Sequence, residues 1–196
     1  MLVIGITGQT GAGKSTLVSL LGFEAIDADQ TAREIMSDKE VLHNLCAAFG
    51  QDILNADGTL DRRKLAFRAF ENSQTVGRLN QITHPAIMKR IIRRIDAYEK
   101  SGQTLILLDA PQLYESGADK LCAKVIAVVA PEDLRQRRII DRDNLSAELA
   151  EKRLGVQKPN SYYGRADFLI VNDGDAALLK TQAEKLKHIL IKLTEE

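Results

Sequence analysis

The stretch that decides the fold is LVIGITGQTGAGKST, residues 2–16. Its first part, LVIGI, is a short and continuous run of Leu, Val and Ile, which is typical of a parallel strand covered on both faces. Residues 8–15 then read GQTGAGKS, which fits the pattern G-x-x-x-x-G-K-[ST], and the apolar run TLVSLL follows as expected for a helix. Strand, loop and helix in this order predict a phosphate-binding loop, or P-loop.

The residue types of this loop suit the phosphates of a nucleoside triphosphate. Glycines let the backbone curl so that successive N–H groups face phosphate oxygens, and the following helix adds its positive N-terminal end. We expect Lys14 to reach the β- and γ-phosphates and the Ser15 hydroxyl to ligate Mg²⁺. The nucleotide-binding residues predicted here are Gly8, Gly11, Ala12, Gly13, Lys14, Ser15 and Thr16.

Further apolar runs predict the rest of the sheet. TLILLDA (104–110) and KVIAVVA (124–130) are strong strand candidates, and EAIDAD (24–29) and FLIV (168–171) are weaker ones. Helical patterns lie between them, including the tail AALLKTQAEKLKHILIKL. Strands that alternate with helices predict an α/β fold, a P-loop three-layer sandwich with a roughly five-stranded parallel sheet.

The domain organisation follows from the spacing of these strands. The helical section between the second and third strands is too long for one crossover, so it should form a subdomain. We predict a single P-loop domain over residues 1–196. Its parts are a core of about 1–29, 103–134 and 160–196, a helical subdomain of about 30–102, and a lid of about 135–159.

Composition excludes several other classes of protein. Lys and Arg total 27 and Asp and Glu total 27, so a general nucleic-acid-binding surface is not expected. Cys46 and Cys122 lie far apart and form no C-x-x-C pair, which argues against a zinc site and favours a reducing compartment. No signal peptide is visible and no apolar run reaches the roughly 20 residues that span a bilayer. We therefore expect a cytoplasmic protein without nucleic-acid or membrane partners.

A pair of carboxylates follows the candidate second strand. Ligands of open α/β sheets bind beyond the carboxyl ends of the strands. On a continuing strand, Asp27 and Asp29 would point to the same side. Phosphoryl transfer to a hydroxyl needs a carboxylate that orients the hydroxyl and takes its proton, and Asp29 is the candidate. Asp29 could also cap a helix that begins near Gln30, and the two roles are compatible.

A second carboxylate, Asp109, ends the strand TLILLD in a Walker-B-like position. It could hold Mg²⁺ directly or through water, or it could only cap the strand end. The segment that follows, APQLYESG (110–117), carries Glu115.

An arginine-rich segment covers residues 133–159. A kinase must exclude water, and a mobile helical lid with arginines can close over the phosphates and neutralise developing charge. Arg138 and Arg142 are four residues apart and would share a helix face. Because Asp and Glu are interleaved, a solvated charged helix is the alternative.

The motifs that are missing narrow the choice of reaction. A GTPase should carry a guanine-reading N/T-K-x-D tetrapeptide, which this sequence lacks. The chain also lacks the size and basic surface expected of a helicase.

Taken together, these stretches resemble the dephospho-CoA kinase family of the nucleoside-monophosphate-kinase-like P-loop group. The resemblance runs over most of the chain. It is carried in order by GITGQTGAGKST (5–16), IDAD (26–29), DGTLDRRKL (57–65), ITHP (82–85), DAPQLYESG (109–117), RRIIDRDNLSAELAEKRLGVQ (137–157) and ADFLIVNDG (166–174).

The resemblance implies ATP-dependent phosphorylation of the ribose 3′-hydroxyl of dephospho-coenzyme A, the last step of coenzyme A biosynthesis, with Mg²⁺ accompanying ATP. By the same resemblance, Asp29 matches the catalytic carboxylate, Arg138 and Arg142 match the lid arginines, and Asn172 and Gly174 match the segment near adenine.

The acceptor, dephospho-coenzyme A, is expected to contact the helical section and the strand ends. The residues assigned to it are Asp27, Arg63, Arg78, His84 and Glu115. His84 precedes Pro85, and such a pair could instead start a helix with proline at its first position.

Three stretches depart from the family pattern, and two other functions stay open. The link from Lys14 to Asp27 is short, Gln112 replaces a leucine, and residues 157–167 are shortened and lack a lysine that is often found there. The alternatives are another small-molecule kinase, with a nucleotide, nucleoside or shikimate-like acceptor, and a nucleotide-dependent regulatory switch.

Overall fold

The computed structural model describes residues 1–195. Its strands and α-helices, in chain order, are β1 (Leu2–Gly8), α1 (Lys14–Leu21), β2 (Ala25–Asp27), α2 (Ala28–Ile35), α3 (Lys39–Phe49), α4 (Arg62–Ala69), α5 (Ser73–Lys100), β3 (Leu105–Asp109), β4 (Lys124–Val129), α6 (Glu132–Asp143), α7 (Ala147–Gly155), β5 (Phe168–Val171) and α8 (Ala176–Leu193). Three short 3₁₀ helices, η1 (Gln51–Ile53), η2 (Ala118–Leu121) and η3 (Asn160–Arg165), lie between them.

The strands form one parallel sheet in the order β2-β3-β1-β4-β5. β1 lies in the centre, with Ile6 opposite Asp109 of β3 and Gly8 opposite Val128 of β4. The carboxyl ends of β1, β3 and β4 therefore meet at the edge from which the phosphate loop emerges. The five-stranded parallel sheet predicted from the sequence is confirmed.

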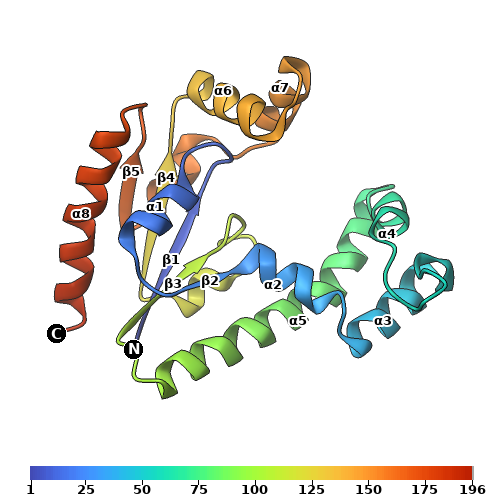
Figure 1. Ribbon diagram of the computed structural model, residues 1–196. Helices are drawn as coiled ribbons and strands as arrows, with labels where there is room; N and C mark the ends of the chain where they lie inside the picture. The colour runs from blue at the N-terminus through green and yellow to red at the C-terminus, as the bar shows by residue number, and fades with distance from the viewer. Residues whose placement is uncertain (196) are drawn as a thin grey trace. The chain divides into compact units, whose positions relative to one another are not determined.

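Helices α1 and α8 cover one face of this sheet and lie alongside each other (Figure 1). Leu17 and Leu21 of α1 and Leu179 and Leu186 of α8 are buried in one cluster with side chains of β1, β3, β4 and β5. α1 ends at Leu21, and its C-cap is Gly22, which has the left-handed φ of 67° that glycine readily adopts at this position. Burial on both faces explains why the strands read as continuous apolar runs.

The other face is closed by the segment after β3 and by η3. Tyr163 packs on Ala127 and Val129 of β4. Against β1, a Cβ built on Gly5 would lie 2.7 Å from Leu113 Cδ2 and 2.9 Å from Cys122 Sγ. Such distances leave no space for a methyl group at position 5.

Replacing Gly5 with Ala should therefore lower the free energy of unfolding by about 1–3 kcal/mol, because the side chains above it must shift. Gly77→Ala is the matched control: Gly77 lies in α5 with no heavy atom within 4 Å of the added Cβ. Alanine there should stabilise the helix by about 0.5–1 kcal/mol. Urea denaturation of both variants measures the free energy of unfolding. A Gly5→Ala protein as stable as the wild type would contradict the packing described.

The chain divides into two compact units. Residues Met1–Ile26 and the chain from Tyr98 onward form the first, and residues Asp27–Ala97 form the second. The second has its own core of apolar side chains from α2, α3, α4 and η1, including Ile35, Leu45, Phe49, Ile53 and Leu65. Residues 135–159 belong to the first unit, so the three-part division with a separate lid stays a prediction. Within residues 1–195, no helix is both long and apolar enough to cross a membrane.

The second strand is shorter than predicted. It ends at Asp27, and α2 begins at Ala28, so the expectation that Asp27 and Asp29 project from one strand is wrong. The cause is local: the Asp27 side chain accepts a hydrogen bond of 2.8 Å from the Gln30 N–H and caps the helix. Asp27 therefore has the capping role considered for Asp29.

The helical section between the second and third strands is interrupted. A turn separates η1 from α4, where Leu54 and Leu60 form an isolated antiparallel bridge. α5 begins at Ser73 behind Asn72, whose side chain accepts the N–H groups of the second and third helical residues. Pro85 thus lies inside α5 and does not start a helix, so it leaves the Gln81 carbonyl without its usual helical donor.

Candidate active site

The backbone of the phosphate loop adopts positive φ angles at its glycines. α1 begins at Lys14, directly after Gly13, which has a left-handed φ of 98°. A Cβ on Gly13 would lie 2.3 Å from the Asn172 amide nitrogen, and a Cβ on Gly8 would lie 2.3 Å from the Val128 carbonyl oxygen. Glycine is therefore required at both positions by close contacts as well as by conformation.

The side chains of Lys14 and Asp109 are in contact. Lys14 Nζ pairs with an Asp109 carboxylate oxygen, and each side chain is only 14% exposed. The pairing follows from the sheet, because β3 lies beside β1 and ends at Asp109. The structure thus places the predicted Walker-B-like carboxylate against the loop, with Ser15 in the next position of α1.

Asn172 and Arg138 also reach the loop. Asn172 follows β5, is 6% exposed, and donates from Nδ2 to the Ala12 carbonyl at 2.8 Å. Arg138 of α6 donates to the Gly11 carbonyl at 3.2 Å and to Asn172 Oδ1 at 3.3 Å. Gly174 lies just before α8, with a φ of 129°.

Arg142 is held within its own helix pair. α6 and α7 are joined by a turn at Asn144, which has a left-handed φ of 50°. Arg142 and Arg153 both pair with Asp143, at 2.7 and 2.5 Å. The hydrogen bond from Arg142 is the main cause that lowers the pKa of Asp143 to about 2. Of the two predicted lid arginines, the structure therefore brings Arg138 to the loop and directs Arg142 to Asp143.

Two glutamines that the sequence did not single out join the loop to the segment just after α7. The Thr10 N–H donates to Gln157 Oε1 at 3.1 Å, and Gln9 Nε2 donates to the Lys158 carbonyl at 3.0 Å. Gln9 is only 3% exposed. Gln157 ends the motif RRIIDRDNLSAELAEKRLGVQ, but a neutral amide among many charges gave no chemical signal of its own.

Glu115 lies beside an aromatic cluster. Burial, followed by the hydrogen bond to Glu115, raises the pKa of Tyr162. The Arg165 guanidinium stacks 3.6 Å from the Tyr114 ring centre and 4.2 Å from that of Tyr162. The segment 157–167, which is shortened relative to the family pattern, therefore packs against the loop that carries Glu115.

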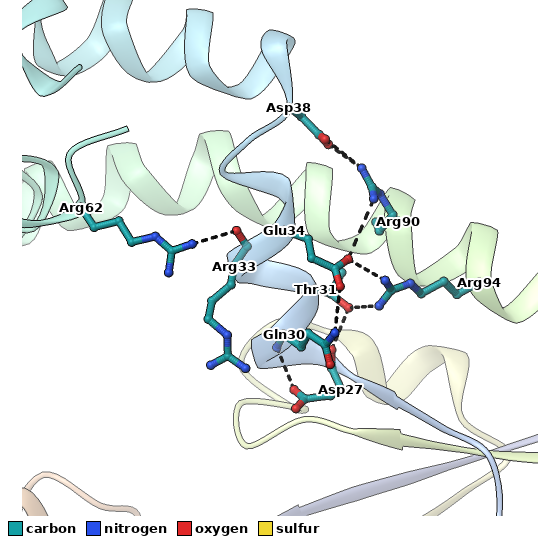
Figure 2. Close-up of polar contacts among 9 residues, drawn as sticks. All are labelled: Asp27, Gln30, Thr31, Arg33, Glu34, Asp38, Arg62, Arg90 and Arg94. Carbon is teal, nitrogen blue, oxygen red and sulfur yellow. Dashed lines mark hydrogen bonds and ion pairs between the residues drawn. The ribbon is translucent and has the colours of Figure 1, made fainter. Parts of the chain in front are cut away.

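In the second unit, arginines of α5 hold α2 (Figure 2). Arg94 donates to Glu34 at 2.6 Å and to Thr31 at 2.9 Å, and Arg90 donates to both carboxylate oxygens of Asp38. Asp29 lies in the first turn of the helix that these contacts fix, and it is exposed. A carboxylate in this position is favoured by the positive end of the helix.

The other predicted acceptor residues are spread over the second unit. Arg63 lies near the start of α4, Arg78 and His84 lie on α5, and Arg78 donates weakly to the Ala48 carbonyl at 3.4 Å. Within residues 1–195, no hydrogen bond or ion pair joins these three side chains. A groove of about 380 Å³ lies between α3 and α5, and its lining includes Lys89 and Arg93.

Comparisons with known proteins agree with the fold and the motifs. Residues 2–177 match the family model described as dephospho-CoA kinase. A dephospho-CoA kinase of Corynebacterium efficiens is 40% identical over 191 residues, which cover 95% of this chain and 96% of that protein.

Two solved structures are similar over nearly the whole chain. That of TT1252 from Thermus thermophilus has a TM-score of 0.81 and 31% identity, and covers 98% of this chain and 97% of that one. Dephospho-CoA kinase from Campylobacter jejuni has a TM-score of 0.74 and 29% identity, with 97% of both chains covered. The chain belongs to the dephospho-CoA kinase family.

Proposed function

We infer that the protein transfers the γ-phosphoryl group of ATP to the 3′-hydroxyl of dephospho-coenzyme A, which gives coenzyme A and ADP. The observation that carries this inference is the family match over residues 2–177, which includes an intact phosphate loop with Lys14 beside Asp109. In this reaction the acceptor oxygen bonds to the γ-phosphorus, and the bond from that phosphorus to the β,γ-bridging oxygen breaks. The bridging oxygen leaves as part of ADP.

The donor is bound by the loop. Its N–H groups and the start of α1 bind the phosphates, and Lys14 leaves Asp109 to reach the β- and γ-phosphates. Arg138 and Arg142 stabilise the negative charge on the transferring group, which requires Arg142 to leave Asp143. The segment that carries Asn172 and Gly174 belongs to the adenine side of the ATP site.

Asp29 takes the proton of the acceptor hydroxyl. It is an exposed carboxylate on a helix fixed by paired arginines, so its position is defined while its oxygens stay open to a ligand. A general base has to hydrogen-bond the hydroxyl from which it takes the proton. Asp27, Arg63, Arg78, His84 and Glu115 bind the rest of the acceptor.

Ser15 and Asp109 are the groups that would hold Mg²⁺. Within residues 1–195 there is no cluster of three or more His, Cys, Asp or Glu side chains suited to a metal ion. This fits Mg²⁺, which proteins bind through one or two groups together with substrate phosphates. The bound ion would neutralise charge on the phosphate oxygens.

We also propose that the protein acts in the cytoplasm, without nucleic-acid or membrane partners. Cys46 and Cys122 are both free thiols, which fits a reducing compartment. The equal numbers of acidic and basic residues give no excess positive charge for phosphate backbones.

ADP release from MgATP with and without dephospho-coenzyme A tests the proposed reaction. We expect release to depend on this acceptor and to produce coenzyme A with a 3′-phosphate, identified by mass spectrometry. Nucleosides, nucleoside monophosphates and shikimate are the control acceptors. A stronger response to one of them would assign another small-molecule kinase, and slow hydrolysis that no acceptor accelerates would assign a regulatory switch.

A further inference from the structure

Two consecutive carbonyl groups of the phosphate loop are held by side chains from outside the loop. Arg138 Nη1 donates to Gly11 O at 3.2 Å, and Asn172 Nδ2 donates to Ala12 O at 2.8 Å. The other end of the amide, Asn172 Oδ1, accepts from Arg138 Nη2 at 3.3 Å. Both ends of the Asn172 amide are thus used within the protein.

The position of Asn172 is fixed from several sides. Its side chain is buried, and its own N–H donates at 2.8 Å to the carbonyl of Val129, the last residue of β4. On the loop side, the contact is so close that a Cβ on Gly13 would lie 2.3 Å from Asn172 Nδ2. A buried amide whose oxygen and nitrogen are both hydrogen-bonded within the protein is poorly suited to hydrogen-bond the nucleotide base.

The bond to Ala12 O has a consequence for the next N–H group. A peptide unit is planar and trans, so its C=O and N–H point in opposite directions. When Asn172 holds the Ala12 carbonyl, the Gly13 N–H of the same peptide must point away from Asn172. Backbone N–H groups of this loop are the donors expected to bind phosphate oxygens.

We propose that Asn172 is a positioning residue for the phosphate loop, and that its side chain sets the affinity for the triphosphate without setting the preference for the base. Arg138 is its partner, because it holds both the neighbouring carbonyl and the Asn172 oxygen. The proposal rests on the proposed use of the loop for the phosphates of ATP, and it does not depend on the identity of the acceptor.

Asn172→Asp tests this role. The aspartate keeps the shape and can still accept from Arg138, but it cannot donate to Ala12 O and places a repelling oxygen there. The dissociation constants of ATP, GTP and inorganic tripolyphosphate are measured by calorimetry with Mg²⁺ and without acceptor. We expect the affinities for ATP and tripolyphosphate to fall by the same factor, about tenfold or more, because a buried carbonyl loses its donor. The ratio of ATP to GTP affinity should stay unchanged.

Gln182→Glu is the matched control. It makes the same amide-to-acid change at a side chain that donates to the neighbouring Val171 carbonyl at 3.2 Å, away from the loop. It should leave all three dissociation constants unchanged. In steady-state kinetics with saturating acceptor and varied ATP, Asn172→Asp should raise KM for ATP more than it lowers kcat.

Two results would overturn the proposal. A loss of ATP affinity with unchanged tripolyphosphate affinity would mean that Asn172 reads the base, and unchanged affinity for both would mean that the bond to Ala12 does not matter. If Asn172→Asp does not fold, as judged by circular dichroism, Asn172→Ala removes the donor without the repulsion, and the same two comparisons apply.

Discussion

Replacing Asp29 with Asn should lower kcat about 10²–10⁴-fold, because an amide can orient the acceptor hydroxyl but cannot take its proton. The affinity for ATP should change little, because Asp29 is assigned to the acceptor hydroxyl and not to the phosphates of ATP. The fold should also change little, since the cap of α2 is made by Asp27 and the helix is held by Arg90 and Arg94, which both pair with Glu34. Steady-state kinetics with calorimetric ATP binding measure these quantities.

Glu40→Gln is the control for the loss of a negative charge. Glu40 is an exposed acid in the first turn of another helix of the same unit, α3, and it has no proposed role. Its neutralisation should leave kcat close to that of the wild type. If Asp29→Asn keeps its turnover, or if Glu40→Gln loses as much, the assignment of the base is wrong.

Lys14→Met should lower kcat/KM about 10²–10³-fold or more, because it removes the positive charge that stabilises the transferring phosphoryl group. Unlike Asp29→Asn, it should also weaken ATP binding. It should destabilise the fold as well, because the ion pair of Lys14 with Asp109 is lost in a site where the Asp109 side chain is 14% exposed. Removal of one partner of a buried charge pair is costly, and this pair is largely buried.

The double variant Lys14→Met/Asp109→Asn separates the two effects. It removes both charges, so it should recover much of the lost thermal stability while staying inactive. Lys180→Met, at an exposed position on α8, is the control for replacing a lysine. Recovery of turnover in the double variant would show that Lys14 serves only to neutralise Asp109.

The elements predicted best from the sequence are those whose bounds depend on neighbouring residues alone. β5 and α8 have the predicted bounds, because an apolar run and a helical period of apolar residues depend on nearby positions alone. The end of α1 also has a local cause, because Gly22 caps the helix with a left-handed φ. The predicted length of the second strand was wrong because a strand and a helix competed at Asp27. The hydrogen bond that the Asp27 side chain accepts from the Gln30 N–H favoured the helix.

The site was predictable in its residue types but not in its contacts. The sequence by itself determined the phosphate loop, the sheet around it and the family, because these depend on ordered motifs. Only the tertiary structure decided that Lys14 pairs with Asp109, that Asn172 and Arg138 hold the loop carbonyls, and that Gln157 joins the loop. These contacts link residues 95 to 160 positions apart, and they exist because parallel strands bring their carboxyl ends to one edge of the sheet.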